Sequence, residues 1–227
     1  MTTCAIMQPT YLPWLGYFDL IRQSDVFVLL DHVQFSRQSW QQRNRIRNRQ
    51  GEVLLTVPVK RNGKKPLALN CAEIADSTII VNKHWRTISQ NYAACDSASD
   101  VLEKLGNVYT SPWQYLALLN IRLIELGCQL MNITTTIVKS TTLGVQGERV
   151  DALIDICEKL NANSYLSTPG ASNYINDEAI EKFGNSGIDF SYHEFEHPVY
   201  QQCNYPDFVS HLAFIDYLLN TYDHGSH

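Results

Sequence analysis

The sequence has no run of about 18 or more apolar residues, the length that a membrane-spanning helix requires. It also has no basic region ahead of its first apolar run, which begins at Cys4. A secretory signal peptide would carry such a region, so we expect residues 3–8 to form a strand instead. These two absences favour a soluble protein of the cytoplasm.

None of the six cysteines forms a C-x-x-C pair with another, and they are scattered along the chain. This usage suits a reducing cytoplasm and argues against both a disulfide framework and a structural zinc site. The sequence also lacks the G-x-S-x-G, H-E-x-x-H and Walker patterns. No motif therefore calls for a metal site or a cofactor, and the identity of any cofactor stays open.

Negative charge dominates the chain, with a net charge of −5, but one segment is strongly basic. Between Arg37 and Lys65 there are nine cations and one acid, Glu52, so this segment carries +8 and the remainder −13. Concentrated charge raises the local concentration of ligands of opposite sign. We expect the segment to bind an anionic small molecule, with a solvated loop as the alternative. The acidic remainder disfavours nucleic acid as the partner.

Hydrophobic patterns predict strands that alternate with helices. Strands are expected at 3–8, 26–30, 53–59, 69–74, 133–138, 164–167 and 188–195, and helices at 14–23, 82–94, 98–106, 112–126, 148–160, 177–183 and 208–222. The continuous apolar run at 26–30 is typical of a parallel strand covered on both faces. Asn62-Gly63 predicts a hairpin turn.

We interpret residues 1–222 as a single α/β domain with a helical insertion near 82–126. Residues 223–227 are expected to fray, and Gly225-Ser226-His227 is interpreted as an artificial addition.

A loop rich in proline and aromatic residues follows the first strand. Its candidate substrate-binding residues are Gln8, Tyr11, Trp14, Gly16 and Tyr17. Ligands of open α/β sheets bind at the carboxyl ends of strands, and a glycine lets backbone or ligand approach closely. The alternative is that the aromatic rings of this loop pack in the core.

Asp31 and His32 follow the second strand, and His197 follows the last one. A histidine can serve as a general base near neutral pH. Asp31 could instead bind an amine, a hydroxyl or a metal, and adjacent positions on a strand start on opposite faces, so Asp31 and His32 need not form a pair. These three are the candidate catalytic residues, and a structural role is the alternative for each histidine.

The basic segment places Arg43, Arg45 and Arg47 at alternate positions, which would face the same way in an extended chain. Arginine suits bidentate recognition of phosphate or carboxylate. The remaining candidate substrate-binding residues are Gln34, Trp40, Asn44, Ser167, Tyr174, Tyr200 and Gln201.

Several motifs, taken in order along the chain, resemble the WbqC-like family of bacterial proteins. They are Gln8-Pro9 through Gly16-Tyr17-Phe18, Ser24-Asp25, Asp31-x-Val33-Gln34-Phe35, Trp40-x-x-Arg43-Asn44-Arg45-Ile46, Leu55-Thr56-Val57-Pro58-Val59, Tyr165-Leu166-Ser167 with Tyr174, His197-Pro198-Val199-Tyr200-Gln201, and Phe214 to Asn220. Gln42 and Thr168 stand where Asn and Gly are expected. The resemblance implies a link to the biosynthesis of O-antigen and other surface polysaccharides, in which activated sugars are modified.

The first strand, its loop and the following helix also look like the start of HIGH-motif nucleotidyltransferases. Trp14 and Tyr17 stand where those enzymes have phosphate-binding histidines, and neither side chain can supply an imidazolium. From this likeness we predict an α/β fold of Rossmann-like, HUP/nucleotidyltransferase type, with a mostly parallel sheet, a β-hairpin and a helical insertion.

Three functions remain open at this point. The first is a transferase that attaches an acyl or aminoacyl group to a nucleotide-linked amino sugar. The second is a nucleotide-dependent ligase or nucleotidyltransferase, and the third is a non-catalytic module that binds a nucleotide or a glycan.

Overall fold

The computed structural model describes residues 1–61, 63, 66–95, 98–173, 175–203, 205 and 207–222. The strands are β1 (Thr3–Met7), β2 (Val26–Leu29), β3 (Arg43–Asn48), β4 (Gly51–Thr56), β5 (Thr136–Lys139), β6 (Ser164–Ser167) and β7 (Asp189–Tyr192). The α-helices are α1 (Leu15–Arg22), α2 (Ser77–Ile79), α3 (Arg86–Tyr92), α4 (Ser99–Tyr109), α5 (Leu116–Leu130), α6 (Val150–Lys159), α7 (Asp177–Asn185) and α8 (Phe214–Thr221). A π-helical stretch at Ile80–Trp85 joins α2 to α3, and 3₁₀ turns lie at Leu69–Cys71, Ser140–Thr142 and Pro169–Asn173.

Contacts between Cα atoms divide the chain into two compact units. The sheet unit comprises Met1–Gln8, Gly16–His32 and Ile133–Glu196, and the helical unit comprises Pro9–Leu15, Val33–Asn132 and His197–His227. The chain therefore passes from one unit to the other five times. Whether the two units fold as the single domain expected from the sequence stays a prediction.

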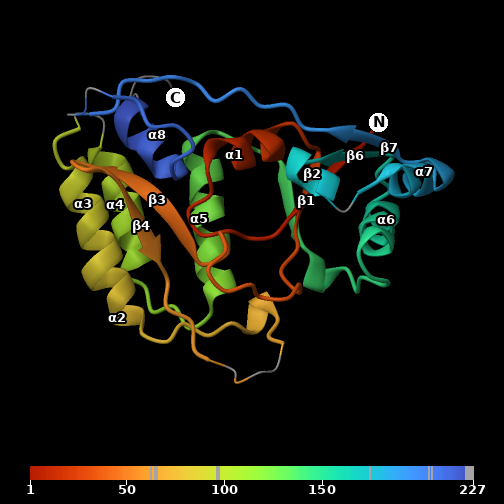
Figure 1. The fold of residues 1–227 in the computed structure, drawn as a ribbon, viewed down its shortest axis with the longest axis horizontal. Helices are drawn as coiled ribbons and strands as arrows, with labels where there is room; N and C mark the ends of the chain where they lie inside the picture. The colour runs from red at the N-terminus through yellow and green to blue at the C-terminus, as the bar shows by residue number, and fades with distance from the viewer. Residues whose placement is uncertain are drawn as a thin grey trace. The chain divides into compact units, whose positions relative to one another are not determined.

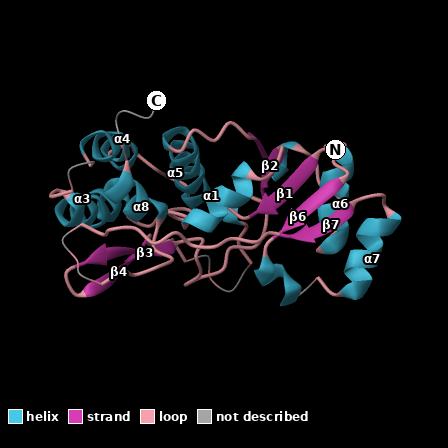
Figure 2. Ribbon diagram, turned by 90° about the horizontal axis from the view of Figure 1, so that it is seen from above, coloured by secondary structure: helices cyan, strands magenta, loops and turns pink. Residues whose placement is uncertain are grey.

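The sheet unit contains one parallel five-stranded sheet in the order β5-β2-β1-β6-β7, and Figure 2 shows β2, β1, β6 and β7 side by side. From β1 the chain first builds outward through β2 and β5, and then returns to the other side of β1 through β6 and β7. The direction of winding therefore reverses between β1 and β6. This is the strand order of Rossmann-like folds, in agreement with that part of the predicted fold class, and the HUP/nucleotidyltransferase type stays a prediction.

Helices cover both faces of this sheet, which explains why its central strands β1 and β2 are apolar on both sides. Cys4, Ile6 and Val28 lie in one apolar cluster with residues of α6 and α7. On the opposite face, the ring of Tyr17 in α1 meets that of Phe27 edge-on at 5.4 Å between centroids. Successive strand residues point to opposite faces, so the two sets alternate along β1 and β2.

The helical unit is built around α5, a mostly buried apolar helix with one exposed stripe formed by Leu118, Arg122, Glu125 and Gln129. α5 packs against α4 and α8, and both α3 and α8 contact β3. The labels in Figure 1 locate these helices beside the β3–β4 hairpin. The rest of its circumference is apolar and buried, so α5 packs in the interior of this unit and turns only this stripe to water.

The hairpin corrects one expectation from the sequence. β3 pairs with β4 from Arg43↔Thr56 to Asn48↔Gly51, so the turn lies at residues 49–50. The segment expected to pair after Asn62-Gly63 instead makes an isolated Val59↔Ile74 bridge. Asn62, Lys64 and Lys65 lie outside the described residues.

The other predicted elements are present, with shifted ends. The first predicted helix of the insertion begins earlier, at Ser77, and the third begins later and runs to Leu130. The last predicted helix is shorter and starts at Phe214 rather than at residue 208. Among the described residues, no helix is long and apolar enough to cross a membrane.

Candidate functional site

Polar residues gather where the strands of the parallel sheet end. Gln8 follows β1, Asp31 and His32 follow β2, and Ser167 is the last residue of β6. Because parallel strands all end at one edge, these residues of the sheet unit belong to a single edge. Open α/β sheets bind their ligands there, at the point where the winding reverses.

The Asp31 side chain at this edge is fixed by three hydrogen bonds. Its carboxylate is 4% exposed and accepts hydrogen bonds from the backbone N–H of Thr141 at 3.1 Å and from the Thr141 hydroxyl at 2.9 Å. It also accepts one from the hydroxyl of Ser140 at 2.9 Å. Ser140 and Thr141 follow β5, the strand next to β2. A buried carboxylate needs such donors, and here they fix its position.

His32 shares Ser140 with Asp31. His32 Nδ1 lies 2.7 Å from Ser140 Oγ, and the backbone N–H of Asp31 donates to the same oxygen at 3.1 Å. His32 itself is exposed, whereas Ser140 is 1% exposed. Asp31 and His32 therefore do belong to one network, which adjacency in sequence alone did not require, and Ser140 connects them.

Ser167 differs from these residues because its hydroxyl has no partner. The side chain is 2% exposed, and its Oγ has no hydrogen-bond partner among the residues that the structure describes. Leaving a buried hydroxyl without a partner costs about 1–3 kcal/mol. Ser167 ends β6, the strand beside β1, and so lies at the reversal of the sheet.

Three candidate residues from the loop after β1 belong to the sheet unit, namely Gln8, Gly16 and Tyr17. Gln8 is exposed at the end of β1. The hydroxyl of Tyr17, which is 2% exposed, donates to the backbone oxygen of Gln8 at 3.0 Å. Gly16 is buried in the first turn of α1. Tyr17 therefore anchors α1 to the end of β1.

The sequence interpretation missed a buried histidine in the same unit. His193 follows β7, is 3% exposed, and places Nε2 at 2.7 Å from Oδ2 of Asp19 in α1. Its backbone N–H donates to the backbone oxygen of Ser167 at 2.7 Å. Asp19 and His193 lie 174 residues apart, as Asp31 and Ser140 lie 109 apart, so no local pattern could have found either pair.

In the helical unit, Tyr11 is fully buried rather than placed on a surface. Its hydroxyl lies 2.7 Å from His84 Nδ1 and 2.7 Å from the hydroxyl of Tyr109. Burial raises the pKa of Tyr11 well above its usual value. These contacts give Tyr11 a role in the packing of this unit, and its substrate contact stays a prediction.

Asn44 and Asn120 hold the loop that contains Tyr11. The Asn44 side chain donates to the oxygen of Leu12, and the Asn120 side chain donates to the oxygens of Pro9 and Gln41. Leu12 has a positive φ of 46°, an unusual conformation for leucine that these bonds help to maintain. Asn44 is 5% exposed, so it positions the loop.

The predicted row of arginines is present on β3, but its members have different environments. Arg45 pairs with Glu52 at 3.1 Å and stacks over the Trp40 ring. Arg47 is 6% exposed and donates to the oxygens of Gly51 and Asp207 at 2.8 and 3.0 Å.

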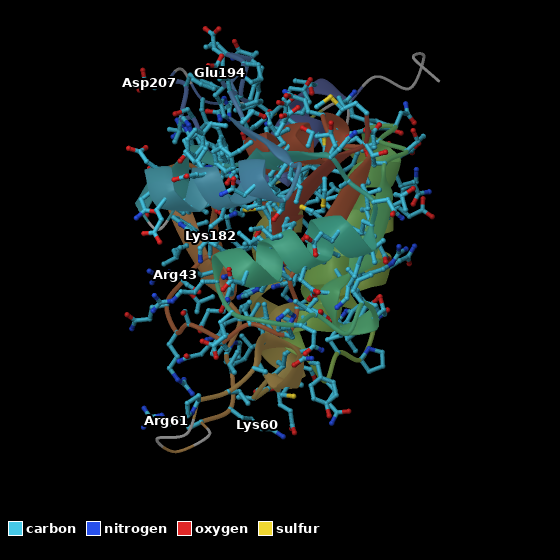
Figure 3. The ribbon with its side chains drawn as sticks, turned by 90° about the vertical axis from the view of Figure 1, so that its right-hand side faces the viewer. Arg43, Lys60, Arg61, Lys182, Glu194 and Asp207 are labelled. Atoms are coloured by element: carbon cyan, nitrogen blue, oxygen red, sulfur yellow. The ribbon has the colours of Figure 1, made fainter. Side chains whose placement is uncertain are left out.

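Arg43 differs from both of these arginines. It is half-buried and projects from the ribbon in Figure 3. Among the described residues it has no ion pair within 4.0 Å. Of the three arginines, Arg43 is therefore the one with a guanidinium group available to an anion.

His197 belongs to an aromatic cluster of the helical unit. Its ring lies 4.9 Å from that of His211, which stacks on Trp14 at 5.1 Å, and 6.3 Å from that of Tyr200. Burial lowers the pKa of His197 below its ordinary value, and the nearby His211 acts in the same direction. The partly buried rings form a surface suited to stacking.

Tyr200 also takes part in a buried network around Asp216, which the sequence interpretation missed. Asp216 is fully buried and accepts hydrogen bonds from the hydroxyls of Tyr92 and Tyr200 and from the side chain of Gln202. Burial raises the pKa of Asp216, while these hydrogen bonds oppose the rise. The network ties α3 and α8 to the segment after His197, so the Tyr200 hydroxyl is engaged in structure.

The remaining predicted residues are exposed or lie outside the described part of the chain. Gln34 and Gln201 are exposed, and Trp40 is 51% exposed. Tyr174 lies outside the described residues. Within the described ranges, no group of three or more His, Cys, Asp or Glu side chains is arranged to hold a metal ion.

Comparison with known proteins agrees with the motifs. The model of the WbqC-like protein family matches residues 8–226. The chain belongs to the WbqC-like family. The predicted resemblance is thereby confirmed over nearly the whole chain.

One relative of this WbqC-like chain is the uncharacterized protein Rv1507c of Mycobacterium tuberculosis (strain ATCC 25618 / H37Rv). It is 29% identical over 221 residues, which cover 97% of this chain and 94% of that protein. No solved structure matches the chain.

Proposed function

We propose that this protein is a transferase that attaches an acyl or aminoacyl group to the amine of a nucleotide-linked amino sugar. The product would serve the biosynthesis of O-antigen or another surface polysaccharide, as the family resemblance implies. The Rossmann-like sheet supports this proposal, because sheets with this order bind nucleotides at the carboxyl ends of their strands.

The buried, unpartnered hydroxyl of Ser167 carries the proposal. A buried polar group without a partner is destabilising, and such groups in folded proteins call for an explanation. A ligand at the end of β6 would supply the missing partner. The proposed ligand atom is an oxygen of the nucleotide, either a phosphate oxygen or a ribose hydroxyl.

The proposed anionic contact in the helical unit is Arg43. A guanidinium recognises a phosphate or carboxylate by two parallel hydrogen bonds, and Arg45 and Arg47 already have other partners. Arg43 would bind a phosphate or a carboxylate group.

Thermal unfolding in the presence of candidate ligands tests the proposal. A ligand that binds only the folded protein raises its melting temperature. We expect stabilisation by nucleotide-linked amino sugars in the wild type. In Ser167→Ala the apparent affinity should fall about 10- to 100-fold, as for one lost hydrogen bond to a charged group.

Ser164→Ala is the matched control, because Ser164 lies at the opposite end of the same strand and is also buried. This control should bind the ligand as the wild type does. Without ligand, Ser167→Ala should unfold at the wild-type temperature or slightly above it, because the Ser167 hydroxyl has no partner to lose.

The same screen separates the alternative functions. Stabilisation by nucleoside triphosphates alone would replace the transferase by a ligase or nucleotidyltransferase. The strand order is compatible with that activity, but the Tyr17 hydroxyl donates to Gln8 and is not available to a phosphate. Binding of a nucleotide sugar without transfer of any acyl donor would favour a non-catalytic binding module.

A further inference from the structure

We propose that His32 is the general base of this site and that Asp31 and Ser140 hold it in the required tautomer. The inference rests on the proposed transfer to an amine, which needs a group to accept a proton. The three side chains all belong to the sheet unit and form a continuous chain of hydrogen bonds.

The hydrogen bonds of Ser140 determine which nitrogen of His32 carries the proton. A serine hydroxyl has one proton to donate and can accept two hydrogen bonds. Ser140 donates its proton to the Asp31 carboxylate at 2.9 Å and accepts from the Asp31 backbone N–H at 3.1 Å. Its remaining contact, 2.7 Å from His32 Nδ1, is then a hydrogen bond that Nδ1–H donates.

The opposite tautomer would satisfy fewer groups. If Ser140 donated to His32 Nδ1, the oxygens of Ser140 and Asp31 would face each other at 2.9 Å without a proton between them. A buried carboxylate gains more from such a donor than an exposed imidazole does. Neutral His32 therefore carries its proton on Nδ1 and presents an unprotonated Nε2.

This arrangement suits a base because protonation changes none of the contacts. The imidazolium also carries a proton on Nδ1, so the bond to Ser140 is kept when Nε2 takes up a proton. Asp31 and Ser140 are positioning residues, and His32 is the residue that would touch the substrate.

The separation of His32 and Ser167 along the edge of the sheet suits a substrate as long as a nucleotide-linked sugar. β2 and β6 lie on either side of β1, so their ends are about 10 Å apart. A nucleotide held at Ser167 could therefore extend its sugar amine toward His32.

In the proposed step, the neutral sugar amine attacks the carbonyl carbon of an activated acyl donor, a thioester or an acyl phosphate. A C–N bond forms and gives a tetrahedral intermediate whose nitrogen is positively charged. This nitrogen releases its proton to His32 Nε2, and the bond from the carbon to the leaving group then breaks with its electron pair. Without the proton transfer the intermediate can return to the free amine and the acyl donor.

The tautomer of His32 can be measured in the ligand-free protein by ¹⁵N NMR of labelled histidine side chains, with His32→Gln identifying the signal. We expect Nδ1 protonated and Nε2 unprotonated near pH 8. Ser140→Ala should shift the ring toward the Nε2–H form, because the acceptor of Nδ1–H is removed. Thr142→Ala is the control, since the Thr142 hydroxyl lies in the same turn but donates to Lys139.

An Nε2–H tautomer in the wild type would overturn the inference, and so would a tautomer that Ser140→Ala leaves unchanged. This result does not depend on the nucleotide sugar, so a failed ligand screen overturns the proposed function alone. Once transfer is measured, His32→Gln should lower kcat about 10²- to 10⁴-fold with little change in KM. Full kcat in His32→Gln would remove the catalytic role even if the tautomer is as expected.

Discussion

His84 Nδ1 lies 2.7 Å from the hydroxyl oxygen of Tyr11, and the His84 side chain is only 3% exposed. Burial lowers the pKa of His84 from its ordinary value of 6.5 to about 4, although a backbone hydrogen bond with Thr56 opposes this. The imidazole is therefore neutral in the folded protein at any pH well above 4.

This pKa predicts how stability depends on pH. Between pH 6.5 and 4 the unfolded chain protonates His84 and the folded protein does not, so the free energy of unfolding falls as the pH is lowered. A shift from 6.5 to about 4 corresponds to a loss of about 3 kcal/mol. His84→Gln should lose less stability than the wild type when urea unfolding is compared at pH 7.5 and pH 4.5. Parallel curves for the two proteins would contradict the prediction.

The contact between His193 and Asp19 is expected to stabilise the sheet unit. His193→Ala removes a buried ring and its hydrogen bond to a carboxylate, which should lower the free energy of unfolding by about 2–4 kcal/mol. His193→Gln can still donate to Asp19 and should lose less. Glu194→Ala, an exposed neighbour, should change stability by less than about 0.5 kcal/mol in the same urea titration. Equal losses in all three variants would refute the specific role of His193.

Substitution of Arg47 should affect mainly the stability of the protein, whereas substitution of Arg43 should affect mainly ligand binding. Arg47→Ala leaves two backbone oxygens without their donor and removes the guanidinium from over the Tyr205 ring, so we expect a loss of about 2–4 kcal/mol. Arg43→Ala should cost less than about 1 kcal/mol but weaken the stabilisation by the anionic ligands of the thermal screen.

Arg61→Ala, which removes an exposed charge from the same basic segment, is the control for Arg43 in the thermal assay. Its stabilisation by ligand should stay close to that of the wild type. An equal loss of binding in Arg61→Ala and Arg43→Ala would show that the positive charge of the segment attracts the ligand and that Arg43 does not bind it specifically.

The two compact units are expected to unfold together. The chain passes between them five times, so neither unit is a continuous piece of sequence. All four tryptophans, Trp14, Trp40, Trp85 and Trp113, belong to the helical unit. Tryptophan fluorescence therefore follows that unit, whereas circular dichroism at 222 nm follows both. Coincident urea transitions would support one domain, and a second transition seen only by circular dichroism would show two.

Local patterns were sufficient for much of the fold. The apolar run of β2 indicated a strand covered on both faces, and the apolar repeat from Leu116 to Leu126 indicated a helix. Their ends were less well predicted, because the residue at which a helix stops depends on caps and packing as well as on periodicity. The hairpin was misplaced because an Asn-Gly turn is a local preference, whereas strand pairing is decided by partners elsewhere.

For the candidate site too, the sequence predicted some features and the tertiary structure was needed for others. The sequence by itself determined that Asp31 and His32 follow a strand and that Ser167 ends one, and therefore that they share one edge of the sheet once the strands are parallel. It also determined the alternation of Arg43, Arg45 and Arg47 along one strand.

Only the tertiary structure decided what each of these side chains does. Ser140 joins Asp31 to His32 from more than a hundred residues away, and Arg47 is held by the oxygen of Asp207. The physical reason is that a hydrogen bond depends on distance and direction in space, which the chain sets only after distant strands have paired. Periodicity along the sequence encodes which residues are buried, but it carries no record of which polar groups meet.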